Sequence, residues 1–219
     1  MPEKDDVVGA THEFHSVEYA RWWSERFEVT PERRDCFEHL ADLLAPSLKS
    51  ESVVLELGIG PGYLAQHLLR RFTKIRYCGL DYSDAMLEIA KARLAEFSPR
   101  IALQRIDLTA AEWEKSVCGP FAAIVSTWAL HDLGREDLIG SVYEAARSLL
   151  HEGGVLVNVD FIRPAAIDRS FEGGRLLASA HVALLKKAGF FEVACSKEFA
   201  VDLDNPTSAS NYACLKGRA

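Results

Sequence analysis

A short apolar segment and the glycine-rich loop after it constrain the fold of this chain more than any other feature. Residues 52–57 are apolar and partly β-branched, and Gly58, Gly60 and Gly62 follow them. A strand that is buried on both faces of a parallel sheet has such a composition. Glycines directly after a strand let the backbone turn tightly and let a ligand approach closely. By itself the pattern fits either a nucleotide-binding turn or a plain glycine-rich turn from the strand into a helix over residues 63–72.

Apolar strand-like segments alternate with amphipathic helical segments through most of the chain. After the glycine loop, strands are expected at residues 75–80, 101–106, 121–127 and 155–159. Helices are expected between them, at residues 83–97 with Ser83 as the cap, and around residues 138–149. Such alternation predicts a parallel sheet with helices on both faces.

The C-terminal part follows a different pattern. A helix is expected over residues 170–188, ended by Gly189 in the left-handed conformation. Two strand-like segments then follow, at residues 191–199 and 211–216, with only a polar loop between them. Strands that are joined by a loop alone can pair antiparallel. Together the segments predict a doubly wound, mostly parallel sheet of seven strands with a C-terminal antiparallel strand pair.

The composition argues against several classes of protein. With 219 residues, 48% of them hydrophobic, the chain is long enough to bury the core of one globular domain. A net charge of −7 without a dense basic run argues against a nucleic-acid partner. No apolar run approaches the roughly 18 residues of a membrane span. The five cysteines lack C-x-x-C spacing, and no apolar signal segment follows the N-terminus, so we expect a cytoplasmic protein without a membrane anchor.

Two aspartates follow the next two strands at positions suited to a nucleoside. Asp81 ends the second strand, where it can accept hydrogen bonds from both ribose hydroxyls or begin the helix near Ser83. Asp107 closes the third strand, where it can accept a hydrogen bond from an adenine amino group or lie on the surface. A dinucleotide fingerprint needs its third glycine at the position of Tyr63. An NAD-dependent oxidoreductase is therefore the weaker alternative.

Six segments, in the same order, resemble motifs of the class I S-adenosylmethionine (SAM)-dependent methyltransferases of the small-molecule type. They are residues 53–62, 79–87, 105–108, 129–133, 149–154 and 181–190. The resemblance implies transfer of a methyl group from SAM to a small-molecule acceptor by in-line displacement. A SAM-binding protein without catalysis remains an alternative, because an intact cofactor motif does not require turnover.

The resemblance also implies which residues bind SAM. Glu56 and the glycines line the methionine end, Asp81 holds the ribose, and Trp128 lies over the cofactor. Ten residues are expected at the cofactor: Glu56, Gly58, Gly60, Gly62, Asp81, Tyr82, Met86, Asp107, Leu108 and Trp128.

A histidine after the fourth strand is the candidate catalytic group. His131 can act as a base, because imidazole titrates near neutral pH, or it can orient or pack against the substrate. Asp132 could orient His131 or cap the following helix, whereas His181 is expected to be a structural helix residue. Metal-dependent catechol-type relatives carry an Asp-Asn pair near the fifth strand. Here Phe161 follows the aspartate, so no metal is expected.

The acceptor pocket is expected between the aromatic N-terminal segment and the end of the fifth strand. Its predicted walls are Tyr19, Trp22, Trp23, Phe161 and Arg175. The N-terminal segment could pack on the domain as a plain helix, or it could close over SAM as a lid that excludes water. The lid is favoured, because a preceding helix often has this role in related enzymes.

The chain is accordingly divided into two parts. Residues 1–46 are predicted to form a helical extension and lid, with residues 1–10 as a loose tail. Residues 47–219 are predicted to form the SAM-binding methyltransferase domain.

Overall fold

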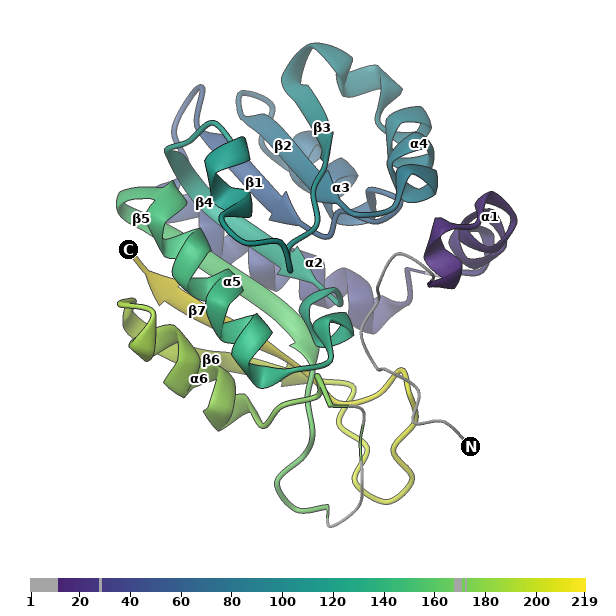
Figure 1. Cartoon of the computed structure of the whole chain (residues 1–219), viewed down its shortest axis with the longest axis vertical. Helices are drawn as coiled ribbons and strands as arrows, with labels where there is room; N and C mark the ends of the chain where they lie inside the picture. The colour runs from purple at the N-terminus through teal and green to yellow at the C-terminus, as the bar shows by residue number, and fades with distance from the viewer. Residues whose placement is uncertain (1–11, 28, 168–170, 172) are drawn as a thin grey trace.

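The computed structural model describes residues 12–27, 29–167, 171 and 173–219, so the tail predicted over residues 1–10 lies outside the described part. Seven strands form one sheet. They are β1 (Val53–Leu57), β2 (Arg76–Asp81), β3 (Ile101–Arg105), β4 (Phe121–Thr127), β5 (Leu150–Phe161), β6 (Phe191–Phe199) and β7 (Tyr212–Arg218). Their order in the sheet is β3-β2-β1-β4-β5-β7-β6 (Figure 1).

The pairing of these strands confirms the predicted doubly wound sheet. Strands β1 to β5 pair in parallel, and β7 pairs antiparallel with both β5 and β6. The chain order reverses between β1 and β4, which are neighbours in the sheet. In open α/β sheets, ligands bind beyond the carboxyl ends of the strands at such a reversal. The register aligns these ends, with Leu57 beside both Leu80 and Ser126.

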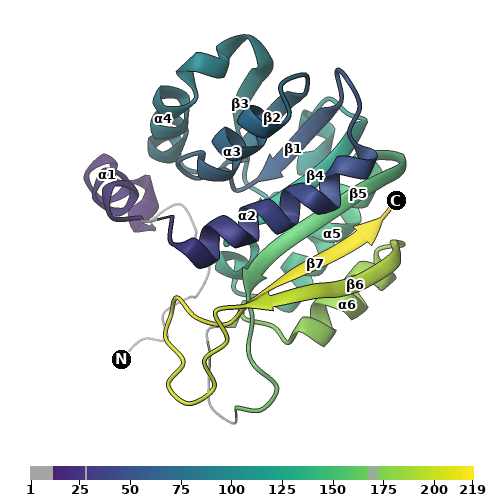
Figure 2. The same cartoon turned by 180° about the vertical axis from the view of Figure 1, so that it is seen from behind.

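Helices cover both faces of the sheet. One face carries α2 (Pro31–Leu44), α3 (Tyr63–Arg71) and α4 (Asp84–Arg93), and the other carries α5 (Glu136–Leu149) and α6 (Ala178–Lys187). Figure 2 shows α2 running across the sheet, whereas Figure 1 shows α5 and α6 in front of the opposite face. The first helix, α1 (Val17–Arg26), lies apart from the sheet and packs against α4.

Neighbouring residues of β1 enter two separate apolar cores. Val54 belongs to the core under α2, α3 and α4, together with Leu64. Leu55 belongs to the core under α5 and α6, together with Ile139. Consecutive side chains of a strand point to opposite faces, so burial of both shows that β1 is covered on each side. This confirms the prediction, made from the largely apolar segment, of a strand buried on both faces.

The start of the predicted helix over residues 170–188 is wrong, because α6 begins only at Ala178. A pair of glycines precedes it, and the second of them, Gly174, lies against the backbone of His131. A Cβ atom on Gly174 would stand 1.7 Å from the His131 carbonyl oxygen. The backbone turns back toward the sheet here, where the N–H of Arg163 donates to the Leu176 carbonyl at 3.0 Å. Close packing on the loop after β4 therefore outweighs helix propensity in this segment.

Strand β5 is longer than the predicted residues 155–159. Its early part is held by the end of the chain: the N–H of Gly153 donates to the Ala219 carbonyl, and the N–H of Ala219 donates to the Gly154 carbonyl, both at 2.8 Å. At its other end β5 continues to Phe161, which pairs with Tyr212 of β7. The extension depends on partners 51 to 66 residues away in the sequence, which local periodicity does not report.

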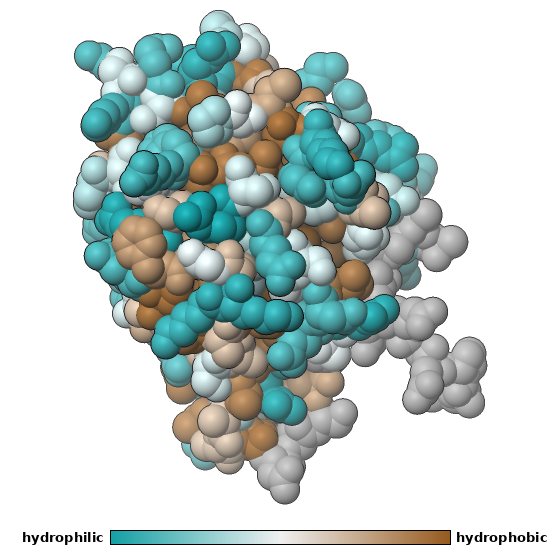
Figure 3. All heavy atoms as spheres, turned by 60° about the vertical axis from the view of Figure 1, so that its left-hand side comes forward, coloured by the Kyte–Doolittle hydropathy of each residue, from teal (hydrophilic) through white to brown (hydrophobic). Residues whose placement is uncertain are grey.

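The surface mixes residue types. Figure 3 shows hydrophilic and hydrophobic side chains intermingled on one face of the molecule. In the described part of the chain, the exposed large hydrophobic residues are Val17, Trp22, Phe191, Val201 and Leu203. They are spread over α1, β6 and the loop after β6. None of the helices in the described ranges is long and apolar enough to cross a membrane.

Candidate active site

A cavity of about 390 Å³ lies beyond the carboxyl ends of β1 to β5, where the chain order reverses. Twelve of the sixteen residues predicted for the site line it: Trp23, Glu56, Gly58, Gly60, Asp81, Tyr82, Met86, Asp107, Leu108, Trp128, His131 and Phe161. The fold therefore brings together residues that are spread over more than a hundred positions of the sequence.

The glycine loop shapes one end of the cavity. Gly58 has φ +69°, and a Cβ atom there would stand 2.4 Å from the Cβ of Ala129. Gly60 has φ +50°, and a Cβ atom there would meet nothing within 4 Å. The first glycine is thus required by close packing, while the second leaves its backbone open toward the cavity, as a ligand-binding loop requires.

Asp81 joins the glycine loop to the start of α4. One carboxylate oxygen accepts from the N–H of Gly60 at 2.8 Å, and the other accepts from the N–H of Ser83 at 2.9 Å. Ser83 in turn caps α4 by accepting from the N–H of Met86 at 3.2 Å. Burial raises the pKa of Asp81, whereas its hydrogen bonds from Ser83 and Gly60 oppose the increase. Asp81 therefore lines the cavity and also stabilises the start of α4, so binding a ligand and supporting the helix do not exclude each other.

Glu56 is an acid buried at the floor of the cavity. It is 1% exposed, and the hydroxyl of Tyr77 donates to its carboxyl group at 2.7 Å. Burial raises the pKa of Glu56 to about 8, the Tyr77 hydrogen bond opposes this, and the charge of Asp81 adds to it. A carboxyl group in such surroundings becomes ionised readily only when a cation lies beside it.

Trp128 lines the cavity in the turn directly after β4. Its φ is +49°, a conformation that bulky residues rarely adopt. Its backbone N–H donates to the Val159 carbonyl of β5 at 2.8 Å, which fixes this turn. The indole nitrogen is buried and has no hydrogen-bond partner within the described part of the chain. Strain and an unsatisfied buried donor are both typical of a ligand-binding position.

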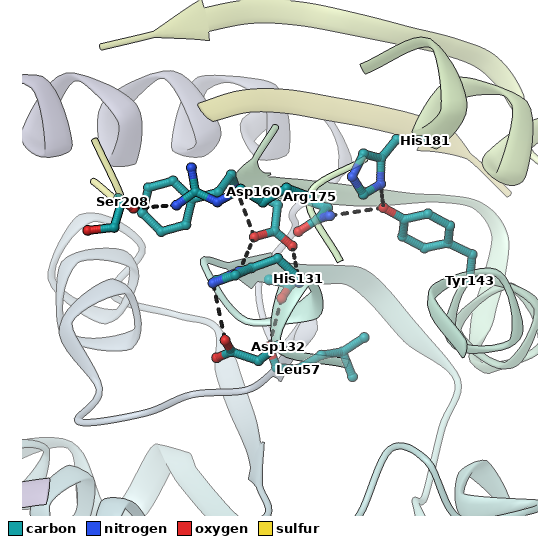
Figure 4. A network of polar contacts seen from close by, with 11 residues as sticks. Leu57, His131, Asp132, Tyr143, Asp160, Arg175, His181 and Ser208 are labelled. Atoms are coloured by element: carbon teal, nitrogen blue, oxygen red, sulfur yellow. Dashed lines mark hydrogen bonds and ion pairs between the residues drawn. The ribbon is translucent and has the colours of Figure 1, made fainter. Parts of the chain in front are cut away.

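His131 lies between two carboxylates (Figure 4). Its Nδ1 is 2.7 Å from Asp160, and its backbone N–H donates to the other oxygen of Asp160 at 2.9 Å. Its Nε2 is 3.2 Å from Asp132, which lines the cavity. Burial lowers the pKa of His131, but the charge and hydrogen bond of Asp160 and the charge of Asp132 outweigh it, so the pKa is raised. The imidazole is thus held in one orientation and is kept able to carry a proton.

Comparison with known proteins identifies the family. A methyltransferase domain family matches residues 54–154. An uncharacterized methyltransferase of Anoxybacillus flavithermus is 31% identical over 167 residues, which cover 74% of this chain and 68% of that protein. The chain belongs to the class I SAM-dependent methyltransferases. Its cofactor is therefore SAM, and the alternatives of an NAD-dependent oxidoreductase and of a binding protein without catalysis are set aside.

Two further proteins are similar to this methyltransferase. Trans-aconitate 2-methyltransferase of Acidovorax ebreus is 31% identical over 125 residues, which cover 52% of this chain and 45% of that protein. The N-methyltransferase NodS from Bradyrhizobium japonicum WM9, solved with S-adenosyl-l-homocysteine, is 18% identical with a TM-score of 0.64. That match covers 88% of this chain and 90% of NodS, and it supports the fold alone.

Gly62 is the one predicted cofactor residue of the methyltransferase that does not line the cavity. It precedes α3 with φ +82°, and a Cβ atom there would stand 3.0 Å from Leu94. Its place in the motif is explained by the close approach of α3 to the end of α4.

Three predicted acceptor-binding residues also lie outside the cavity lining: Tyr19, Trp22 and Arg175. Trp22 is 48% exposed, and the guanidinium of Arg26 lies over its ring. Arg175 is buried, donates to the Ser208 carbonyl and lies 4.7 Å from the ring centre of Phe161 (Figure 4). Arg175 therefore packs against Phe161, which lines the cavity, but does not itself line the cavity.

Several residues that line the cavity are not among the predicted ones. They include Phe14, Phe27, Arg33, Phe37, Tyr63 and Ser208. The hydroxyl of Tyr63 donates to the Ser24 carbonyl at 2.9 Å, which ties the N-terminal segment to the glycine loop. A signal was present in the sequence, because Phe27 lies four residues after Trp23 and Phe37 lies four residues after Arg33, the spacing of neighbours on one helix face. In the structure Phe27 follows the last residue of α1.

The structure also bears on the roles considered for Asp132 and His181. Asp132 does not cap the following helix, since α5 begins after Arg135 without a side-chain cap. His181 is fully buried, and its Nδ1 is 2.8 Å from the hydroxyl of Tyr143, which accepts from Asn158 at 2.9 Å (Figure 4). Burial lowers the pKa of His181. This arrangement agrees with a structural role for His181.

Proposed function

We propose that this protein transfers the methyl group of SAM to a small-molecule acceptor by in-line displacement. The observation that carries the proposal is a single cavity that joins the predicted cofactor residues to the candidate base. Gly60 and Asp81 line one part of it, while His131 and Phe161 line another. Both reactants can therefore lie side by side in one space, which direct transfer between them requires.

The residues present fit SAM. The backbone at Gly60 is open to the cavity, and the carboxylates of Asp81 and Asp107 are available to the ribose and the adenine. The buried carboxyl group of Glu56 suits the ammonium of the methionine end. When bound, SAM supplies a methyl group that its sulfonium has already made electrophilic.

His131 is the proposed base for an acceptor that must lose a proton before it attacks. Asp160 fixes the ring through two hydrogen bonds, so the imidazole keeps one orientation. The raised pKa of His131 leaves it able to exchange a proton near neutral pH, where general bases are most effective.

The N-terminal part, residues 1–46, is proposed to act as the lid. Of its described residues, Phe14, Trp23, Phe27, Arg33 and Phe37 line the cavity. These side chains exclude water from the reacting groups, which strengthens electrostatic interactions inside the cavity. Residues 47–219 form the SAM-binding domain in this proposal.

A small acceptor is supported by the size of the cavity and by charge. A volume of about 390 Å³ lies within the range of small-molecule sites, about 300–1,000 Å³. A net charge of −7 disfavours contact with a phosphate backbone. The similarity to trans-aconitate 2-methyltransferase, named for a small organic acid, agrees with this class.

The test is incubation of the purified protein with methyl-labelled SAM and a cell extract that has been separated into small-molecule, protein and nucleic-acid fractions. The proposal expects label in a small-molecule product that mass spectrometry can identify. The Asp81→Ala variant, with its cofactor site impaired, serves as the negative control. Label that accumulates only in the macromolecular fractions would contradict the proposed acceptor class.

A further inference from the structure

The surroundings of Asp160 show which nitrogen of His131 carries a proton. Asp160 is fully buried, and it accepts backbone N–H groups of His131 and Phe161, each at 2.9 Å. Backbone N–H groups can only donate, so this carboxylate acts as an acceptor. The His131 Nδ1 at 2.7 Å therefore donates its hydrogen to Asp160, because a lone pair facing the carboxylate would be repelled.

The other ring nitrogen then faces a second carboxylate. The Nε2 of His131 is 3.2 Å from the Oδ1 of Asp132. If the ring were neutral, its Nε2 lone pair would lie close to an anion. One proton between the two groups removes this repulsion, either on His131 or on Asp132. The pKa directions agree: burial raises the pKa of Asp132, and the two aspartates raise that of His131 against its burial.

We propose that Asp132 and His131 act together as one base, and that Asp132 is the member that receives the proton of the acceptor. This inference rests on the proposed function. Both residues line the cavity, and the side chain of Asp132 is the more exposed of the two, at 34% against 16% for His131. The acceptor class that follows is a nucleophile with an O–H or N–H bond.

The reaction step balances without a further reactant. The active pair has lost its shared proton, so His131 is neutral and Asp132 is ionised. The proton of the acceptor moves to Asp132, which lies beside Nε2, while the electron pair of the O–H or N–H bond stays on the nucleophile. That pair forms the bond to the methyl carbon as the carbon–sulfur bond breaks with its electrons on sulfur. Restoring the shared proton relieves the repulsion between the two groups.

Other charged and titratable groups surround the pair. They are His12, Tyr19, Asp160, Arg175 and His181. Arg175 lowers the pKa of both members of the pair, and His12 lowers that of Asp132. None of these groups lies between Nε2 and the carboxylate of Asp132, so the proton at this contact belongs to the pair.

The first test follows the ring of His131 by NMR, using histidine labelled with carbon-13 and saturating S-adenosylhomocysteine, so that no acceptor is needed. His131→Gln assigns the signal. We expect the wild-type midpoint to lie above the ordinary value of about 6.5, and Asp132→Asn to lower it by about one pH unit. Asp137→Asn is the matched control, because Asp137 is exposed and paired with Arg135. An unchanged midpoint in Asp132→Asn overturns the proposal.

The second test uses the product found with labelled SAM. Asp132→Asn should lower kcat on its high-pH plateau by about 100-fold, with S-adenosylhomocysteine affinity within about threefold of wild type. A change in KM alone, with the plateau kept, would show that Asp132 only binds the acceptor, and would overturn the proposal. A wild-type protein that methylates no small molecule would instead refute the proposed function. The NMR titration would still decide whether His131 and Asp132 titrate as a pair.

Discussion

Glu56 is predicted to release a proton when SAM binds. It is 1% exposed, and its carboxyl group accepts one hydrogen bond, from Tyr77, so burial raises its pKa to about 8. At neutral pH the acid is therefore mostly neutral in the free protein. If the methionine ammonium lies beside it, the ionised form is favoured, and binding drives the proton into solution.

The magnitude follows from the pKa. With a pKa of about 8, roughly 0.9 of the Glu56 side chains are protonated at pH 7 and about 0.1 at pH 9. Binding should release up to about 0.9 proton at pH 7 and almost none at pH 9. Because protons are released, a rise in pH favours binding. The affinity should increase up to about tenfold per pH unit below pH 8 and then level off.

Isothermal titration calorimetry in buffers of different ionisation enthalpy measures this release directly. Glu56→Gln should abolish the release from this position and weaken binding. Tyr77→Phe removes a hydrogen bond that lowers the pKa of Glu56, so it should move the pH range of the release upward. No release from the wild type at pH 7, or the same release from Glu56→Gln, would refute the reasoning.

Three further predictions concern single positions. Asp81→Ala should weaken SAM binding on the order of 100-fold in calorimetry, because charge-assisted hydrogen bonds are lost; an effect below threefold would contradict this role. Gly58→Ala should lower the free energy of unfolding by about 2–5 kcal/mol, from backbone strain and the clash with Ala129. Gly153 has φ +77° and open space around it, so Gly153→Ala should lower the free energy of unfolding only by the backbone strain, about 1–2 kcal/mol. Denaturant titration measures both variants. Tyr143→Phe should cost about 1–3 kcal/mol, since two buried partners lose their hydrogen bonds.

The parts of the fold that could be predicted are those encoded by local patterns. The apolar run at β1 and the cap at Ser83 each lie within a few residues of the structure they specify. The late start of α6 depends instead on contact between Gly174 and His131, which are distant in sequence. The length of β5 likewise depends on pairing with Ala219. Such contacts exist only once the sheet has formed, so periodicity cannot report them.

The same distinction applies to the site. The predicted cofactor residues follow the ends of strands, and the parallel sheet places these ends together, so the sequence could predict that Asp81 and Asp107 line one cavity. Which of the aromatic residues predicted to bind the acceptor line the cavity depends on the direction of each side chain of α1. Trp23 faces the cavity, whereas Trp22, one residue earlier, is exposed. A rotation of 100° between neighbouring helical residues separates them, and the aromatic pattern alone does not fix that rotation.

The end of β5 connects the cofactor side of the cavity to the acceptor side. Val159 accepts the backbone N–H of Trp128, and the next residue, Asp160, holds the ring of His131. Both anchors lie on one strand that is paired on both sides, so the two turns that carry Trp128 and His131 are held by the same part of the sheet. The N-terminal segment takes part in neither of these hydrogen bonds, although Phe37 and Arg33 of α2 pack against the ring of Trp128. We therefore expect substitutions at Trp23 in α1 to change the lining of the cavity without breaking either of these two hydrogen bonds.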